Sequence, residues 1–160
     1  LSIVVKYEGG AQVVYLNGIN YGDAIRTPEM SLYASAVSAI PAVREFLLDT
    51  QRRVARETSV VMDGRDIGTV VLPDAQVKIF LTADVRVRAE RRYKELLEKG
   101  QKANYETVLK EIQQRDYQDT HREVAPLKLA RDSIKVDTSD LDIDGVIAEL
   151  KRIIGEKIPL

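Results

Sequence analysis

The chain begins with three short runs rich in β-branched and aromatic residues, over residues 2–7, 11–16 and 19–21. Gly9-Gly10 and Asn17-Gly18 separate these runs. Both residues of each pair tolerate positive φ, which is typical of tight hairpin turns. We therefore predict a three-stranded antiparallel meander at the start of the chain.

A helical pattern follows the meander. Thr27 has the character of an N-cap, and Pro28 and Glu29 suit a first helical turn, so we predict a helix that runs to about Ala39. A second helix is expected from Pro41 to about Arg56, with Val43, Leu47 and Val54 on its apolar face.

Short apolar runs then alternate with helical patterns. We expect buried strands over residues 58–63, 77–81 and 133–136, and helices that begin after Asp84, Asn104 and Asp142. Strands separated by helices indicate a parallel α/β core, to which the meander and its helices are appended. Three strands are few for such a sheet, so we expect further strands before Leu1.

Composition restricts the function. The 160 residues carry a formal net charge of -1, with 44% hydrophobic and 31% charged residues, which suits a globular protein with a buried core and not a general nucleic-acid binder. There is no apolar run of membrane-spanning length. The absence of Cys excludes thiol chemistry and fits a reducing cytoplasm, and the single His121 excludes multi-histidine metal sites. Because the chain begins at Leu1, without Met and within a strand pattern, we expect it to be part of a longer protein.

The first candidate site lies at the end of the run over residues 58–63. Asp63, Arg65 and Asp66 follow it, with Gly64 and Gly68 allowing positive φ or close approach to a ligand. In open α/β sheets, ligands bind beyond the carboxyl ends of the strands, so this segment predicts a site for an anionic ligand. The alternative is a turn whose Asp and Arg pair with each other.

The second candidate site is the triplet Arg115, Asp119 and Arg122, which the spacing i, i+4, i+7 places on one helical face. Such a triplet is more often a solvated ion-pair ladder. Here it continues the apolar face of residues 105–112, and the segment over residues 124–127 turns the chain back toward the core. The arginine run over residues 86–92 is by itself a solvated helix face, and Ser35 and Arg44 by themselves are unremarkable.

Residues 63–71, D-G-R-D-I-G-T-V-V, resemble the D-G-R-D-φ-G-T-V-V signature of bacterial cytidylate kinases. Further segments follow at the spacing of that family, over residues 25–27, 41–45, 73–75, 78–81, 91–92, 115–122 and 125–127. The resemblance covers essentially the whole chain. It implies an α/β P-loop kinase with a parallel sheet core, incomplete here, an appended meander and a helical lid. The corresponding division is a monophosphate-binding lobe over residues 1–57, core over 58–90 and 116–160, and lid with its flanking helix over 91–115.

The resemblance also implies a reaction, the transfer of the γ-phosphoryl group of ATP to CMP or dCMP with Mg²⁺. Ser35, Arg44 and Asp66 would face the cytosine, Arg65 and Arg115 would bind the substrate phosphate, and Asp119 would lie near the ribose. Arg122, with Arg91 or Arg92, would reach the transferring phosphates. Arg26 would add to the monophosphate lobe, and Asp63 would orient Mg²⁺ through water, with no direct metal ligand. The implied partners are the nucleotides, without nucleic acid or membrane, and the complete protein would be a monomer.

One feature of the family is not found in this sequence. A P-loop kinase needs G-x-x-x-x-G-K-[ST] to hold the phosphates of ATP, and no such segment occurs here. We therefore expect the complete protein to be a kinase and this chain alone to be weakly active at best. The alternatives are a non-catalytic pyrimidine-nucleotide-binding module, a kinase for another pyrimidine monophosphate such as UMP, and a structural α/β domain.

Overall fold

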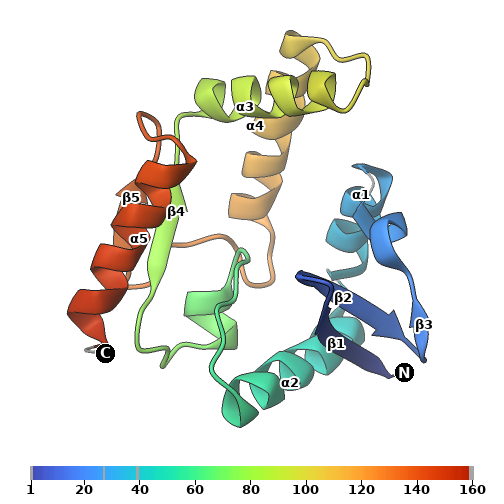
Figure 1. Ribbon diagram of the computed structural model, residues 1–160, viewed down its shortest axis with the longest axis vertical. Helices are drawn as coiled ribbons and strands as arrows, with labels where there is room; N and C mark the ends of the chain where they lie inside the picture. The colour runs from blue at the N-terminus through green and yellow to red at the C-terminus, as the bar shows by residue number, and fades with distance from the viewer. Residues whose placement is uncertain (1, 27, 39, 159–160) are drawn as a thin grey trace. The chain divides into compact units, whose positions relative to one another are not determined.

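A computed structural model describes residues 2–26, 28–38 and 40–158 of the chain (Figure 1). These residues fall into two compact units, Leu1–Thr50 and Gln51–Leu160, each with its own small sheet.

The first unit contains the meander. Strands β1 (Ile3–Glu8), β2 (Ala11–Leu16) and β3 (Ile19–Asn20) pair antiparallel in the order β1-β2-β3. The turn residues Gly9 and Gly10 have φ of 60° and 81°, and Asn17 and Gly18 have φ of 50° and 83°. Positive φ at both central residues matches the right-handed twist of the flanking strands, which confirms the predicted hairpins.

Two helices follow the meander after the short 3₁₀ helix η1 (Gly22–Arg26). Helix α1 spans Pro28–Ser38, and α2 spans Pro41–Glu57, close to the predicted bounds. The predicted N-cap Thr27 lies outside the described residues. No described residue of α2 is fully buried, and Val54 on its apolar face is 39% exposed.

The second unit contains the parallel sheet. Strands β4 (Ile79–Thr82) and β5 (Ile134–Asp137) pair in parallel, with Ile79 opposite Ile134. The connection between them carries α3 (Val85–Glu98) and α4 (Tyr105–His121), which cross near the loop that joins them (Figure 1). Helix α5 (Ile143–Lys157) follows β5.

The strand predicted over residues 58–63 is not formed in the described part of the chain. A β-branched run becomes a strand only where a neighbouring strand accepts its hydrogen bonds. Strands β4 and β5 pair with each other, and Val61 is 98% exposed. The run therefore stays irregular, and the described core has two parallel strands where the sequence predicted three.

The ends of the helices follow the sequence closely. Asp84, Asn104 and Asp142 each accept a hydrogen bond from a backbone N–H of the first turn of α3, α4 and α5. Gly100 has φ of 71° just beyond the end of α3, the left-handed conformation that a Gly adopts at no cost. None of the described helices is long and apolar enough to cross a membrane.

The core of the second unit is small. Ala89 of α3 and Ile153 of α5 are almost completely buried. Tyr93 of α3 packs edge-on against Tyr105 of α4, with ring centroids 6.2 Å apart. Helix α4 therefore packs against α3 at its first residue, and its C-terminal half with the following cap carries the predicted triplet.

Candidate functional site

The D-G-R-D segment leads into one tight turn. The backbone carbonyl of Asp66 accepts hydrogen bonds from the N–H groups of Val70, at 2.8 Å, and Val71, at 3.2 Å, and so closes the π-helical turn η2 (Ile67–Val71). Turns of this kind are rare and occur mostly near functional sites.

Gly64 and Gly68 lie where neighbouring side chains come close to the backbone. Neither Gly64 nor Gly68 is among the residues with positive φ. A Cβ at Gly64 would lie 2.9 Å from Cγ1 of Ile67, and one at Gly68 would lie 3.3 Å from Cδ of Lys78. The glycines therefore make room for neighbouring side chains. Of the two uses expected from the sequence, positive φ is wrong, and close approach to a ligand stays a prediction.

Two cations hold the turn from outside. Arg52 of α2 donates to the carbonyls of Val70, at 2.8 Å, and Val71, at 3.0 Å, where the turn leaves acceptors unpaired. Lys78, only 8% exposed, donates to the carbonyl of Pro73 and pairs with Asp132 at 2.6 Å. Both ends of the segment after Asp66 are thus fixed by charge-assisted hydrogen bonds.

The turn and α4 meet at a buried carboxylate. Nε of Arg65 donates to Oδ2 of Asp119 at 2.6 Å, and Nε of Arg115 lies 4.0 Å from the same oxygen. Asp119 is only 7% exposed, whereas the side chains of Arg65 and Arg115 are 43% and 56% exposed. The carboxylate therefore orients the guanidinium of Arg65 through a hydrogen bond and attracts that of Arg115, and both arginine side chains stay partly exposed.

Arg122, at the C-terminal cap of α4, extends the same group. Its Nη2 lies 3.8 Å from Oδ1 of Asp66, and its Nε donates to the carbonyl of Ala125 at 2.7 Å. Nη2 is buried and has no hydrogen-bond partner among the described residues. The N–H of Leu127 donates to the carbonyl of Asp119 at 2.7 Å, so the segment after α4 folds back onto the end of this helix.

We call this group the arginine cluster: Arg65, Arg115 and Arg122 with Asp66 and Asp119. The structure brings these five predicted residues together, and the ladder of solvated ion pairs is excluded for Asp119 by its burial. A planar guanidinium binds phosphate through paired N–H groups, and three guanidinium groups around two carboxylates leave a net positive site. The arrangement can bind an anion of the size of a phosphate group.

Other predicted residues of the second unit lie in other surroundings. Nη2 of Arg91 donates to the carbonyls of Thr138, at 2.6 Å, and Leu141, at 3.0 Å, beyond β5. Arg92 pairs with Glu95 on its own helix at 2.8 Å. Asp63 is exposed, and the described residues contain no group of three side chains that could hold a metal ion.

The remaining predicted residues belong to the first unit. Arg44 lies on α2 and is half-buried. Ser35 lies on α1 and Arg26 ends η1, and both side chains lie outside the described residues. Their roles stay predictions.

Comparison with known proteins identifies the family. Residues 1–156 match the family described as cytidylate kinase. This chain belongs to that family. The fold class expected from the sequence is confirmed, since cytidylate kinases are P-loop kinases and the chain combines a parallel sheet, an antiparallel sheet and helices.

Curated cytidylate kinases resemble the chain closely. The protein of Thermosipho melanesiensis is 52% identical over 146 residues, which cover 91% of this chain and 67% of that protein. Those of Streptococcus pyogenes serotype M18 and Lactobacillus gasseri are 53% and 49% identical, over 89% and 98% of this chain and 63% and 68% of their own lengths. The chain thus spans about two thirds of the length of these cytidylate kinases.

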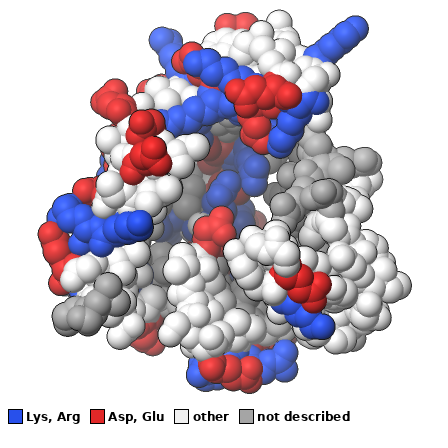
Figure 2. Space-filling view, viewed as in Figure 1, with Lys and Arg blue, Asp and Glu red and all other residues white. Residues whose placement is uncertain are grey.

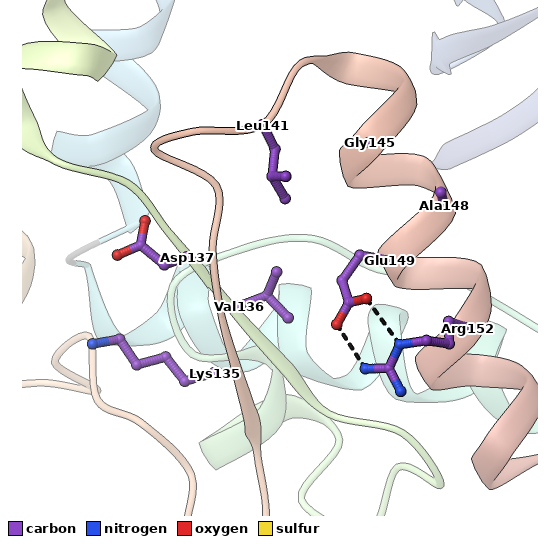
Figure 3. A pocket seen from close by; sticks show the side chains of 8 residues that line it. All are labelled: Lys135, Val136, Asp137, Leu141, Gly145, Ala148, Glu149 and Arg152. Carbon is purple, nitrogen blue, oxygen red and sulfur yellow. Dashed lines mark hydrogen bonds and ion pairs between the residues drawn. The ribbon is translucent and has the colours of Figure 1, made fainter.

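A separate pocket of about 460 Å³ lies between β5 and α5 (Figure 3). Val136 and Leu141 line it together with Glu149, which pairs with Arg152 at 2.7 Å. None of the site residues predicted for a cytidylate kinase lines this pocket. Over the surface seen in Figure 2, basic and acidic side chains are interspersed.

The residues that support the candidate site could not be picked out from the sequence. Arg52 and Lys78 hold the turn after Asp66, and Arg88 forms a two-pronged ion pair with Asp116. One signal was available for Lys78, because a lysine that precedes the apolar run 79–81 of a buried strand needs a partner for its charge. By itself, the arginine run over residues 86–92 predicts a solvated helix face. The sequence pattern gives no sign that Arg88 pairs with Asp116, which lies 28 residues later.

Proposed function

We propose that the complete protein transfers the γ-phosphoryl group of ATP to CMP and dCMP, which gives CDP or dCDP and ADP. The observation that carries this proposal is the arrangement of Arg65 and Arg115 around the buried Asp119 in a member of the cytidylate kinase family. Relatives of this chain that are about 50% identical are named cytidylate kinases.

Binding of the substrate phosphate falls to Arg65 and Arg115. Asp119 already holds Nε of Arg65, so the guanidinium is oriented before any ligand arrives. A phosphate group therefore meets Arg65 without the entropic cost of ordering a free arginine, and Arg115 adds a second charge-assisted contact. Asp119 thereby acts on the phosphate through its arginines, in addition to the ribose contact that the family resemblance implies.

Recognition of cytosine falls to Asp66, with Arg44 and Ser35. A carboxylate accepts a hydrogen bond from the N4 amino group of cytosine, and a guanidinium donates to N3 or O2. Uracil presents a carbonyl in place of the amino group, so it leaves the carboxylate facing an acceptor. Each such mismatch costs about 1–3 kcal/mol, which is enough to favour cytosine.

Arg122 is the cation proposed for the transferring phosphates, with Arg91 or Arg92. Its buried Nη2 is available to an anion, whereas Arg91 has to leave the carbonyls of Thr138 and Leu141 to take part. Mg²⁺ bound with ATP supplies further neutralisation of the phosphate oxygens. The exposed Asp63 is the residue that would orient this ion through water.

Two other functions carry different expectations. A kinase for UMP would show no preference for cytosine, and a non-catalytic binding module would bind CMP without turnover of ATP. The missing G-x-x-x-x-G-K-[ST] segment makes the second alternative relevant to this chain by itself.

Calorimetric titration of this chain with CMP, UMP and ATP tests the proposal. We expect CMP to bind about fivefold to a hundredfold more tightly than UMP, on the basis of one such mismatch. Asp66→Ala should remove this preference, whereas Arg53→Ala, at an exposed position of α2, should retain it. Equal affinity for CMP and UMP in the unsubstituted chain would refute the roles of Asp66 and Arg44. An assay of ADP formation with CMP and ATP separates the kinase from the binding module.

A further inference from the structure

Arg88 joins three elements of the second unit. Its Nε donates to the carbonyl of Ala83 at 3.0 Å, directly after β4. Its Nη1 and Nη2 donate to Oδ1 and Oδ2 of Asp116 at 2.9 Å and 2.7 Å. One guanidinium on α3 therefore ties the end of the sheet to the middle of α4.

The partner of Arg88 lies beside the arginine cluster. Asp116 follows Arg115 directly and precedes Asp119 by three residues on α4. Arg115, Asp116 and Asp119 lie within little more than one turn of the same helix, so a rotation of α4 moves all three together. The 2.6 Å contact between Arg65 and Asp119 depends on the rotation and height of this helix.

The ion pair is better suited to orientation than to stability. The side chains of Arg88 and Asp116 are 36% and 42% exposed, and pairs of such exposure contribute little to the free energy of folding. A two-pronged guanidinium–carboxylate pair nevertheless permits one relative geometry, which a single-point contact does not. The carbonyl of Ala83 fixes the guanidinium itself, since Ala83 is buried at the end of β4.

We propose that Arg88 and Asp116 are positioning residues, which hold α4 so that Asp119 and Arg115 meet Arg65. The proposal rests on the function proposed above, because it assigns to the pair the geometry of the substrate-phosphate site. Neither residue is among those proposed above to bind the nucleotide. Displacement of a binding group by about 1 Å can reduce activity a hundredfold, so a remote pair of this kind can have a large effect.

The test compares Arg88→Gln, Asp116→Asn and the double variant in the full chain. Arg86→Gln on α3 and Glu111→Gln on α4 are matched controls, since both are exposed and neither belongs to the arginine cluster. The first measurement is the hydrogen exchange of the Nε–H of Arg65, observed by NMR with labelled arginine. The second is the Kd for CMP, and the third is the midpoint of thermal unfolding.

We expect faster exchange of the Arg65 Nε–H and roughly tenfold weaker CMP binding in each single variant, with the double variant no worse than either. The thermal midpoint should fall little in Asp116→Asn and further in Arg88→Gln, which also takes the donor from the carbonyl of buried Ala83. The controls should resemble the unsubstituted chain. Arg88→Lys keeps the charge but loses the two-pronged geometry, so it should behave like Arg88→Gln. If Arg88→Lys instead keeps the Arg65 exchange rate and the CMP affinity of the unsubstituted chain, the two-pronged geometry does not explain the effect of Arg88→Gln, and the proposal is wrong.

Unchanged exchange at Arg65 in folded Asp116→Asn would also overturn the proposal, and this nearly isosteric variant serves if Arg88→Gln does not fold. The exchange measurement needs no nucleotide. If the unsubstituted chain fails to bind CMP, the proposed function fails, whereas the coupling between Asp116 and Arg65 is still decided by the exchange rate.

Discussion

Nε of Arg65 donates to Oδ2 of Asp119 at 2.6 Å, across 54 residues of sequence. This contact joins the D-G-R-D segment to α4 and places a buried carboxylate beneath the guanidinium groups that we assign to the substrate phosphate. Its two ends differ in environment, since Asp119 is 7% exposed and the Arg65 side chain is 43% exposed. Loss of the negative charge of Asp119 therefore has its main effect at the buried end of this contact.

Asp119→Asn should lower the free energy of unfolding by about 1–2 kcal/mol. Hydrogen bonds to charged groups contribute about 1.5–3 kcal/mol, and the partial exposure of Arg65 reduces the loss because its guanidinium regains water. Urea unfolding measures the change. Asp74→Asn, at an exposed position before β4, should leave the midpoint unchanged. Equal stability of Asp119→Asn and the unsubstituted chain would contradict a structural role for the contact.

Arg52→Gln should destabilise the chain by about 1–2 kcal/mol. Arg52 donates to the carbonyls of Val70 and Val71, and removal of a charged donor leaves these acceptors of η2 without their partner. Arg53→Gln changes the next residue of α2, which is exposed, and should have almost no effect. Chemical unfolding of both variants gives the comparison, and a similar loss in both would show that Arg52 acts only through general charge.

Local signals predicted much of the fold. Gly9-Gly10 and Asn17-Gly18 fixed the hairpins because few other residues adopt positive φ in both turn positions. Asp84, Asn104 and Asp142 marked helix starts because each side chain accepts from the first turn of its own helix. These features depend on neighbours in sequence, so the sequence is sufficient to predict them.

Features that depend on distant partners were harder to predict. The run over residues 58–63 has the composition of a strand, but strand formation requires a neighbouring strand that sequence composition does not reveal. Glycine at positions 64 and 68 suggested a backbone with positive φ. In the structure, both positions lack a Cβ where the side chains of Ile67 and Lys78 lie close to the backbone. The five members of the arginine cluster were predicted through the family resemblance and the helical spacing, and their supports Arg52, Arg88 and Lys78 were not.

Asp132→Asn should make the chain less sensitive to acid. The hydrogen bond from Lys78 lowers the pKa of Asp132 below its ordinary value of 3.8. A lowered folded-state pKa contributes stability above the unfolded-state pKa, and this contribution is lost as the pH falls through the folded-state value. Stability should therefore decrease less steeply below about pH 4 in Asp132→Asn than in the unsubstituted chain.

Thermal unfolding at a series of pH values from about 5 to 2.5 tests this prediction, because the contribution of the Lys78 contact is lost as the pH falls below the ordinary pKa of a carboxyl. Asp140→Asn is a suitable control because Asp140 is an exposed carboxylate in the loop after β5. Other carboxylates with pKa values lowered by cationic or hydroxyl partners, Glu90, Glu95, Asp137 and Glu149, keep a residual acid sensitivity in every variant. Identical pH profiles for the two Asn variants would mean that the Lys78 contact does not persist in solution.

Gly64→Ala and Gly155→Ala should change stability in opposite directions. A Cβ at Gly64 would lie 2.9 Å from Cγ1 of Ile67, a distance that forces the Ile67 side chain or the turn to move. Overpacking of this kind costs about 1–3 kcal/mol. A Cβ at Gly155 in α5 meets no atom within 4 Å, so alanine there should stabilise the helix by up to about 1 kcal/mol.

The same pair of variants separates stability from site geometry. Because Gly64 immediately precedes Arg65, its substitution should also speed exchange of the Arg65 Nε–H, whereas Gly155→Ala should leave this exchange unchanged. If Gly64→Ala lowers stability but leaves Arg65 bound to Asp119, the glycine serves only the packing of Ile67. If both change, the absence of a side chain at residue 64 is required for the D-G-R-D segment to present Arg65 to α4.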